Sequence, residues 1–205
     1  MTTDGKGLWI VVWSDGDIRV ARSTDNGMTW STLADLLVSG QLDIDPQIVT
    51  DGSGRWMCVW QSGDEVLAAV SLDDGISWNT PIQLSQPPES PEDFEAIVNS
   101  KPRLATNGQG LWITVWTHLA EPKFIKPPPD DLPIWRGTVH LSRSMDDGTS
   151  WSDPTELLED FSSSNYRPDI ASDGMNDWIS VWVRDPLLSP SPFPAVQSLE
   201  VPVFE

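Results

Sequence analysis

Ser23-Thr24-Asp25-Asn26-Gly27-Met28-Thr29-Trp30 is the first of three stretches that decide the fold of this chain. The same pattern, Ser-x-Asp-x-Gly-x-Thr/Ser-Trp, returns at residues 71–78 and 144–151. A short Asp carboxylate can accept hydrogen bonds from its own turn, and Gly supplies the positive φ that such a turn needs. The pattern therefore predicts three copies of one tight turn between β-strands. The defining residues are Ser23, Asp25, Gly27, Trp30, Ser71, Asp73, Gly75, Trp78, Ser144, Asp146, Gly148 and Trp151.

Four Trp pairs form a second repeat, and each pair follows an Asp/Asn-Gly dipeptide. The pairs are Trp9 and Trp13, Trp56 and Trp60, Trp112 and Trp116, and Trp178 and Trp182. A spacing of four also suits one face of a helix. The residues between are often β-branched, however, as in Ile10-Val11-Val12, and a turn dipeptide precedes each run. We therefore predict strands with both Trp on one face, and we expect the second Trp of each pair to be mostly buried between sheets.

The spacing of the Trp residues predicts the architecture. The step from Trp13 to Trp30 is 17 residues and the step from Trp30 to Trp60 is 30, which gives a unit of 47 residues. This length suits a four-stranded propeller blade. Two longer gaps, at Ser85–Asn99 and His118–Trp135, are rich in Pro and are predicted to be loops. The predicted fold is all-β, a partial or small β-propeller of roughly four blades, two complete and two partial.

The repeat also places the blade boundaries. We expect propeller blades over residues 1–184, at 3–38, 45–85, 100–160 and 166–184, followed by a Pro-rich C-terminal tail at 185–205. The first blade lacks its first strand, because Met1–Thr3 leave little room for one. The last blade has only its first two strands assured, and Val196–Phe204 can add one more.

The charge of the chain argues against two classes of partner. Lys and Arg total 12 against 31 Asp and Glu, a formal net charge of −19. Such a surface repels phosphate backbones and anionic lipids, so we expect neither nucleic acid nor membrane as a partner. No apolar stretch is long enough to span a bilayer, and the N-terminus lacks the regions of a signal peptide. The single cysteine, Cys58, can form no intrachain disulfide and is expected to be buried.

No metal and no cofactor are predicted. The Asp-rich turns lack the ligand array of a calcium loop. His118 and His140 are far apart in sequence and have no Cys or His companions at zinc spacing. Neither a Gly-x-Ser-x-Gly nucleophile motif nor a phosphate loop is present. Asp25, Asp73 and Asp146 are therefore interpreted as structural residues of their turns.

At the three turn motifs the chain resembles the Asp-box, or BNR-repeat, family of sialidase-like β-propellers, over almost all of residues 3–184. The motif is specific for the fold but not for an activity, since it occurs in glycosidases, sorting receptors and assembly factors. The resemblance implies six blades and favours a secreted or extracellular protein. Three outcomes are then expected. The missing blades lie in a longer chain, a second copy supplies them in a homodimer, or the four blades close on themselves.

The sialidases of that family hold a substrate carboxylate with three arginines and use a tyrosine, activated by a glutamate, as nucleophile. Their first arginine lies in an Arg-Ile-Pro motif at the start of an innermost strand. At such positions this chain has Arg103 in Pro102-Arg103-Leu104 and Arg167 in Tyr166-Arg167-Pro168. Neither matches the motif. The resemblance makes Arg103 and Arg167 the candidate substrate-binding residues and Tyr166, the only tyrosine, the candidate nucleophile.

These observations favour a non-catalytic sialidase-like scaffold or binding module for a glycan or protein ligand, as part of a larger protein or assembly. The alternative is an exo-α-sialidase-type glycoside hydrolase, with this chain as a fragment of the catalytic propeller. A third hypothesis is a truncated product without independent activity. Convergence of the Arg103 and Arg167 side chains in one central funnel would favour the hydrolase.

Overall fold

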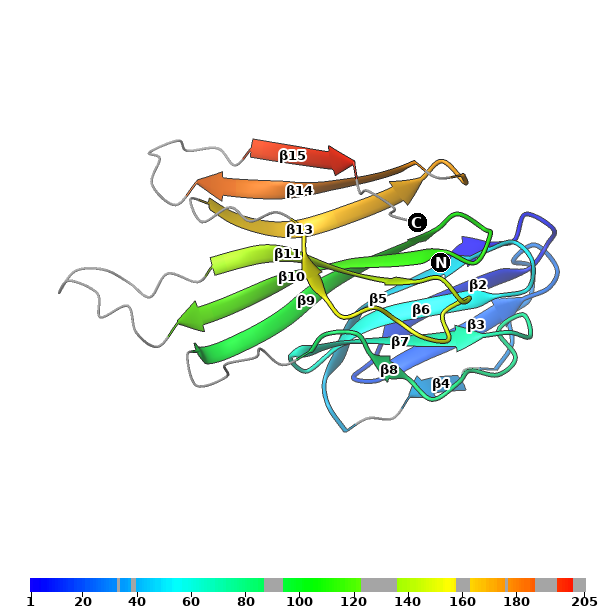
Figure 1. Cartoon of the computed structure of the whole chain (residues 1–205). Helices are drawn as coiled ribbons and strands as arrows, with labels where there is room; N and C mark the ends of the chain where they lie inside the picture. The colour runs from blue at the N-terminus through cyan, green and yellow to red at the C-terminus, as the bar shows by residue number, and fades with distance from the viewer. Residues whose placement is uncertain are drawn as a thin grey trace.

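The computed structural model describes residues 1–32, 34–37, 40–86, 94–122, 136–157, 163–175, 177–186 and 195–200. In this part of the chain every regular element is a β-strand, and the strands form four antiparallel sheets that follow one another along the sequence (Figure 1). Each sheet is a meander, in which neighbours in the sheet are neighbours in sequence. No helix that could cross a membrane occurs among the described residues.

The first sheet contains β1 (Thr2–Thr3), β2 (Trp9–Ser14), β3 (Ile18–Ser23) and β4 (Ala34–Leu37). The second contains β5 (Asp43–Thr50), β6 (Trp56–Ser62), β7 (Glu65–Ser71) and β8 (Ile82–Gln83). The third contains β9 (Phe94–Thr106), β10 (Trp112–Pro122), β11 (Arg136–Ser144) and β12 (Thr155–Glu156). The fourth contains β13 (Ser163–Ser172), β14 (Trp178–Pro186) and β15 (Ala195–Glu200). The expectation that the first blade lacks its first strand is wrong, since Thr2–Thr3 form β1, and β15, within the predicted Pro-rich tail, gives the fourth sheet a third strand.

In the first three sheets, the turn that follows the third strand is held by its own side chains. In the first turn Ser23 Oγ donates to Asp25 Oδ1 at 2.7 Å and accepts the Gly27 N–H at 2.8 Å. Asp25 accepts both the N–H and the hydroxyl of Thr29, at 2.8 and 2.5 Å. The turns at 71–78 and 144–151 repeat this set of bonds. Every copy also holds a second residue at positive φ, Asn26, Asp74 or Asp147, before its Gly.

These bonds lead to a pH-dependent stability. Donation from Thr29 or its Ser counterpart, and then from the first Ser, lowers the pKa of Asp25, Asp73 and Asp146 from 3.8 to about 2. The unfolded chain therefore takes up these protons first, and the stabilisation is lost as the pH falls from about 4 towards 2. When all three Asp residues are changed to Asn, we expect the melting temperature to fall less steeply as the pH falls from about 4 towards 2. An unchanged acid profile in that variant would contradict the role assigned to the carboxylates.

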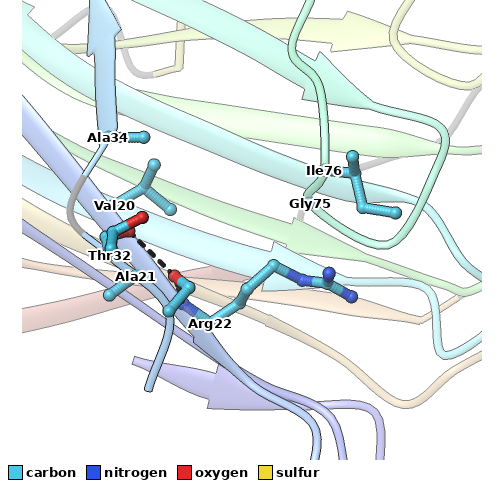
Figure 2. Close-up of a pocket in the computed structure, with 8 residues that line it drawn as sticks. Val20, Ala21, Arg22, Thr32, Ala34, Gly75 and Ile76 are labelled. Atoms are coloured by element: carbon cyan, nitrogen blue, oxygen red, sulfur yellow. Dashed lines mark hydrogen bonds between the residues drawn. The ribbon is translucent and has the colours of Figure 1, made fainter.

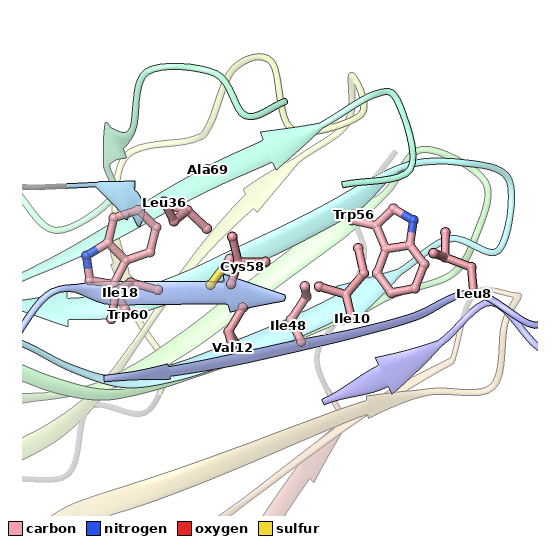
Figure 3. Close-up of a cluster of buried hydrophobic side chains, with 11 residues drawn as sticks. Leu8, Ile10, Val12, Ile18, Leu36, Ile48, Trp56, Cys58, Trp60 and Ala69 are labelled. Atoms are coloured by element: carbon pink, nitrogen blue, oxygen red, sulfur yellow. The ribbon is translucent and has the colours of Figure 1, made fainter. Parts of the chain in front are cut away.

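Successive sheets pack face to face through the Trp pairs. Trp56 and Trp60 of β6 lie in one hydrophobic cluster with Ile10 and Val12 of the first sheet (Figure 3). Trp112 and Trp116 pack in the same way on Met57 and Val59, and Trp178 and Trp182 on Ile113 and Val115. The side of a sheet that carries the Trp pair is called here the tryptophan face, and the opposite side the aliphatic face. In the second, third and fourth sheets, the tryptophan face therefore packs on the aliphatic face of the preceding sheet.

The predicted burial of the second Trp of each pair is confirmed for three of the four. Trp60, Trp116 and Trp182 are 0, 0 and 3% exposed. The prediction is wrong for Trp13, which is only half-buried. Its sheet is the first of the series, so no preceding sheet of the chain covers its tryptophan face.

The prediction of two Pro-rich loops is wrong over part of each segment. Phe94–Asn99 and His118–Pro122 continue β9 and β10, with pairs that include His118 with Asn99 and Ala120 with Ile97. These stretches carry apolar and β-branched residues that suit a ladder, while the Pro clusters that suggested loops lie outside the described residues. The third sheet therefore extends further than the others at this end.

Candidate functional site

The innermost strands β5, β9 and β13, each the first of its sheet, share one irregularity. Asp45, Lys101 and Arg167 have φ values of 53, 56 and 53°, each precedes a Pro, and each lies where the strand pairing shifts register. The left-handed region is unfavourable for residues other than Gly, more so before Pro, and costs of order 1–3 kcal/mol. A charged residue in this conformation occurs in three consecutive sheets. Such strain, repeated at one position of three successive first strands, marks a candidate site.

The three bulges come from strands that pack in succession, β5 on β9 and β9 on β13. The Lys101 ammonium lies 2.6 Å from the Asp45 carboxylate, which joins the second and third sheets. The Arg167 N–H donates to Thr117 Oγ of β10 at 2.9 Å, which joins the fourth sheet to the third. Arg167 itself is exposed. The arrangement gives a row of three charged residues, Asp45, Lys101 and Arg167, of which the last faces solvent.

Asn99, two residues before Lys101, connects this row to the core. Its side-chain oxygen accepts the Trp116 indole N–H at 3.0 Å and lies 2.8 Å from His118 Nδ1. Its backbone N–H and its side-chain amide both donate to Asp64 O, at 2.9 and 3.1 Å. Because the Asn99 oxygen is an acceptor only, His118 must carry its proton on Nδ1 to make this bond. Asn165 of β13 repeats the indole contact, with Trp182 at 3.0 Å.

The pairing of β10 with β11 brings the two histidines together. The rings of His118 and His140 are stacked with centroids 4.3 Å apart, and the Trp116 ring lies 6.1 Å from His140. Burial lowers the pKa of His118, and burial followed by the charge of His118 lowers the pKa of His140 to about 3. Both rings are therefore neutral near pH 7. Sequence separation concealed this pair, because a long insertion divides the two strands that carry it.

The histidine pair has its own effect on stability. The unfolded chain protonates His140 below about pH 6.5, whereas the folded chain resists protonation until about pH 3. Stability is therefore lost as the pH falls through this window, with a slope of up to about 1.4 kcal/mol per pH unit. Changing His140 to Gln is expected to make the free energy of unfolding depend less steeply on pH between pH 6.5 and 4. A variant with the same slope as the wild type would show that His140 titrates freely.

The residues singled out by the sialidase resemblance are not equivalent to one another. Arg103 lies two residues beyond the bulge of β9, is half-buried, and donates from Nη1 to Pro102 O at 2.8 Å. Its counterpart on β13 is Asp169, not Arg167. No hydrogen bond or ion pair within the described ranges joins Arg103 to Arg167. Tyr166 is half-buried opposite Val183, and no carboxylate of the described residues is bonded to its hydroxyl.

The described residues contain no group of three or more His, Cys, Asp or Glu that could hold a metal ion. Cys58 is buried, and burial raises the pKa of its thiol. A groove of about 200 Å³ lies between β3, β4 and the second Ser-x-Asp turn (Figure 2). Its lining includes Val20, Arg22 and Ile76 and none of the inner-strand residues. The structure thus separates this groove from the row of Asp45, Lys101 and Arg167.

Comparison with known proteins gives matches in structure only. No protein-family model and no curated protein matches the chain. Solved structures resemble it over nearly its whole length, including a Hadza microbial sialidase (17% identity over 95% of this chain, TM-score 0.52). An α-L-arabinanase of Penicillium chrysogenum complexed with arabinobiose gives 13% identity over 96% and a TM-score of 0.54. An ulvan lyase bound to GlcA(1-4)Rha3S gives 11% identity over 90% and a TM-score of 0.64.

The chain is a partial β-propeller. Its four consecutive sheets are the blades, and the fold class predicted from the sequence is confirmed. The chain spans 42, 59 and 50% of the three matched structures, about half of their length. Identities this low show the shared propeller fold and leave the activity to be argued from the residues of this chain.

Proposed function

We propose that this partial propeller is a non-catalytic binding module for a glycan that carries an anionic group. The observation that carries the proposal is the row of strained inner-strand residues, which ends in the exposed guanidinium of Arg167. A planar guanidinium matches a carboxylate or sulfate through two parallel hydrogen bonds. Strain held at one position in three consecutive blades suits a ligand surface fixed in advance of binding.

The distribution of positive charge supports an anionic ligand. The chain has 12 Lys and Arg residues, and Lys101, Arg103 and Arg167 all lie on two neighbouring inner strands. Asp45 neutralises Lys101, whereas no described carboxylate forms an ion pair with Arg167. The net charge of −19 opposes an anion at long range. At physiological salt this opposition is screened over about 8 Å, so nearby cations dominate within the site.

The structural neighbours support a saccharide as the ligand. The ulvan lyase was solved with GlcA(1-4)Rha3S, which carries both a uronate and a sulfate, and the arabinanase was solved with arabinobiose. The three Ser-x-Asp turns, with identical internal bonds, support assignment to the Asp-box group of propellers. The share of the neighbours that this chain spans supports a place in a larger protein or assembly.

The environment of Tyr166 favours binding over catalysis. A tyrosine nucleophile needs a base to take its proton, and no hydrogen bond joins the hydroxyl of the half-buried Tyr166 to a carboxylate of the described residues. Arg103 is bonded to its own backbone and occupies a different position of the repeat from Arg167. An exo-α-sialidase-type hydrolase is the second candidate function. The one observation that favours it is that Tyr166 and Arg167 are adjacent in the sequence.

Calorimetric titration tests the proposal with two probes, a glucuronate-containing ulvan disaccharide and neutral arabinobiose. We expect binding of the acidic sugar, weakened by added salt. Changing Arg167 to Gln should weaken it by about 10- to 100-fold, as loss of a charged hydrogen bond implies. Arg143→Gln, which removes the same charge near the third Ser-x-Asp turn, is the matched control. Equal affinity for both sugars, or no effect of Arg167→Gln, would contradict the proposal, and release of sialic acid from a model sialoside would support the hydrolase.

A further inference from the structure

The three blade interfaces of the chain are copies of one another. In each, a Trp pair on the tryptophan face of one blade covers the two aliphatic residues between the Trp positions of the preceding blade. The covered residues are 8% exposed or less, namely Ile10, Val12, Met57, Val59, Ile113 and Val115. The third Trp of the blade joins the same contact, since Trp78 and Trp151 pack against these clusters. One pattern of side chains therefore defines how a blade of this kind meets its neighbour.

The first blade carries an unused half of this interface. Trp9 and Trp13 are only half-buried and belong to none of the hydrophobic clusters of the described residues. Trp30, the counterpart of Trp78 and Trp151, is 41% exposed. Since the three Trp occupy the positions that cover a preceding blade elsewhere in the chain, this face is built to contact an aliphatic face.

The fourth blade carries the other half. Ile179 and Val181 stand at the positions of the covered aliphatic pairs, yet they are 54 and 37% exposed. Trp178 and Trp182 of the same strand are buried against the third blade, so the strand is packed on one side and open on the other. No hydrophobic cluster of the described residues joins the first and fourth blades. Closure of the four blades on themselves, one of the outcomes expected from the sequence, is therefore not observed.

We propose that the occupant of each open face is a second copy of this chain. The tryptophan face of one copy packs on the aliphatic face of the other, head to tail, as the blades within one copy already pack. Because the two faces differ, the contact is heterologous, and two copies that use both faces form a closed ring. Eight blades lie within the usual range of four to eight for propellers. The proposal rests on the blade interfaces and is independent of the proposed glycan site.

The net negative charge of the chain opposes this association, and the effect of salt on the association therefore tests the proposal. Each copy carries a net charge of −19, so two copies repel one another until salt screens them. The contact itself is apolar, with Trp on one side and Ile and Val on the other. Added salt is therefore expected to strengthen the association, which is the opposite of its effect on the anionic glycan.

Sedimentation velocity and light scattering of the intact chain test the proposal. The chain has a mass of 22.7 kDa, and the expected species has twice that mass. The double variants Trp9→Ser/Trp13→Ser and Ile179→Asp/Val181→Asp each remove one face, and each alone should be monomeric. Mixed together they should form a heterodimer, because each supplies the face that the other lacks. Met145→Asp, at a 65% exposed turn residue away from both faces, is the control and should leave the dimer unchanged.

Several results would overturn the proposal. These are a wild-type monomer at high protein and salt concentration, dimerisation of either double variant alone, or no association in the mixture. Growth of the wild type into polymers of rising mass would overturn the closed ring. Melting curves and near-ultraviolet circular dichroism establish that the variants are folded. If a double variant fails to fold, the single changes Trp30→Gln and Val181→Asp, both at exposed residues, should weaken association at least about tenfold, the effect expected of a residue at the centre of an interface.

Discussion

Replacing Trp116 with Ala is expected to lower the free energy of unfolding by about 3–5 kcal/mol, the range for a large aromatic side chain removed from a core. The ring is 0% exposed and packs between the second and third blades with Met57 and Val59. The change also removes the indole N–H that Asn99 accepts. Denaturant unfolding followed by far-ultraviolet circular dichroism measures the effect.

Trp13→Ala is the matched control, since Trp13 holds the same position in the first blade and is only half-buried. Because no preceding blade packs on Trp13, its removal should lower the free energy of unfolding by less, about 1–2 kcal/mol, as expected from partial burial of an apolar side chain. The two variants should be compared at low protein concentration, so that association of two copies does not bury Trp13 further. Equal costs for the two variants would show that Trp13 is covered as fully as Trp116.

Asn99→Ala should lower the free energy of unfolding by about 2–4 kcal/mol, because it leaves more than one buried polar group without a partner. The Trp116 indole N–H and the Nδ1 proton of His118 both lose their acceptor, and Asp64 O loses the side-chain amide. The side chain is also one of the polar links between the second and third blades, beside the Lys101–Asp45 ion pair. Chemical denaturation measures the loss, and the His118 imidazole resonances should shift in the NMR spectrum.

Asn165→Ala is the corresponding control. Asn165 accepts the Trp182 indole N–H, but its side-chain amide has no partner among the described residues. Its removal should therefore cost less, about 1–2 kcal/mol for a single lost hydrogen bond. If both variants lose the same stability, the additional bonds of Asn99 contribute nothing measurable and its role as a link is wrong.

Much of the fold could be predicted because local chemistry determines it. The Ser-x-Asp turns and the Trp pairs act within stretches of eight and five residues, so their strands and turns can be read without knowledge of the rest of the chain. The exposure of Trp13 could not be read in this way. It depends on whether a neighbouring sheet is present, which the local pattern does not encode.

The candidate site was only partly visible in the sequence. Pro46, Pro102 and Pro168 recur at one position of the repeat, and comparison of the three segments would have aligned Lys101 with Arg167. The sialidase resemblance singles out Arg103 and Arg167, which are two positions apart in that alignment. The stacked histidines depend on the register of β10 with β11 across a long insertion, and no spacing rule predicts such a register.

The packing of each Trp pair on the preceding blade also sets the order in which the chain matures on the ribosome. A blade emerges with its aliphatic face uncovered, and the Trp pair that covers it follows 47, 56 or 66 residues later, counted from Trp13, Trp60 and Trp116 to the second Trp of the next pair. At synthesis rates of about 5–20 residues per second, each of the first three blades waits roughly 2–13 seconds for its cover. Blades are thus completed in sequence from the N-terminus, and the last exposed face always belongs to the most recently synthesised blade.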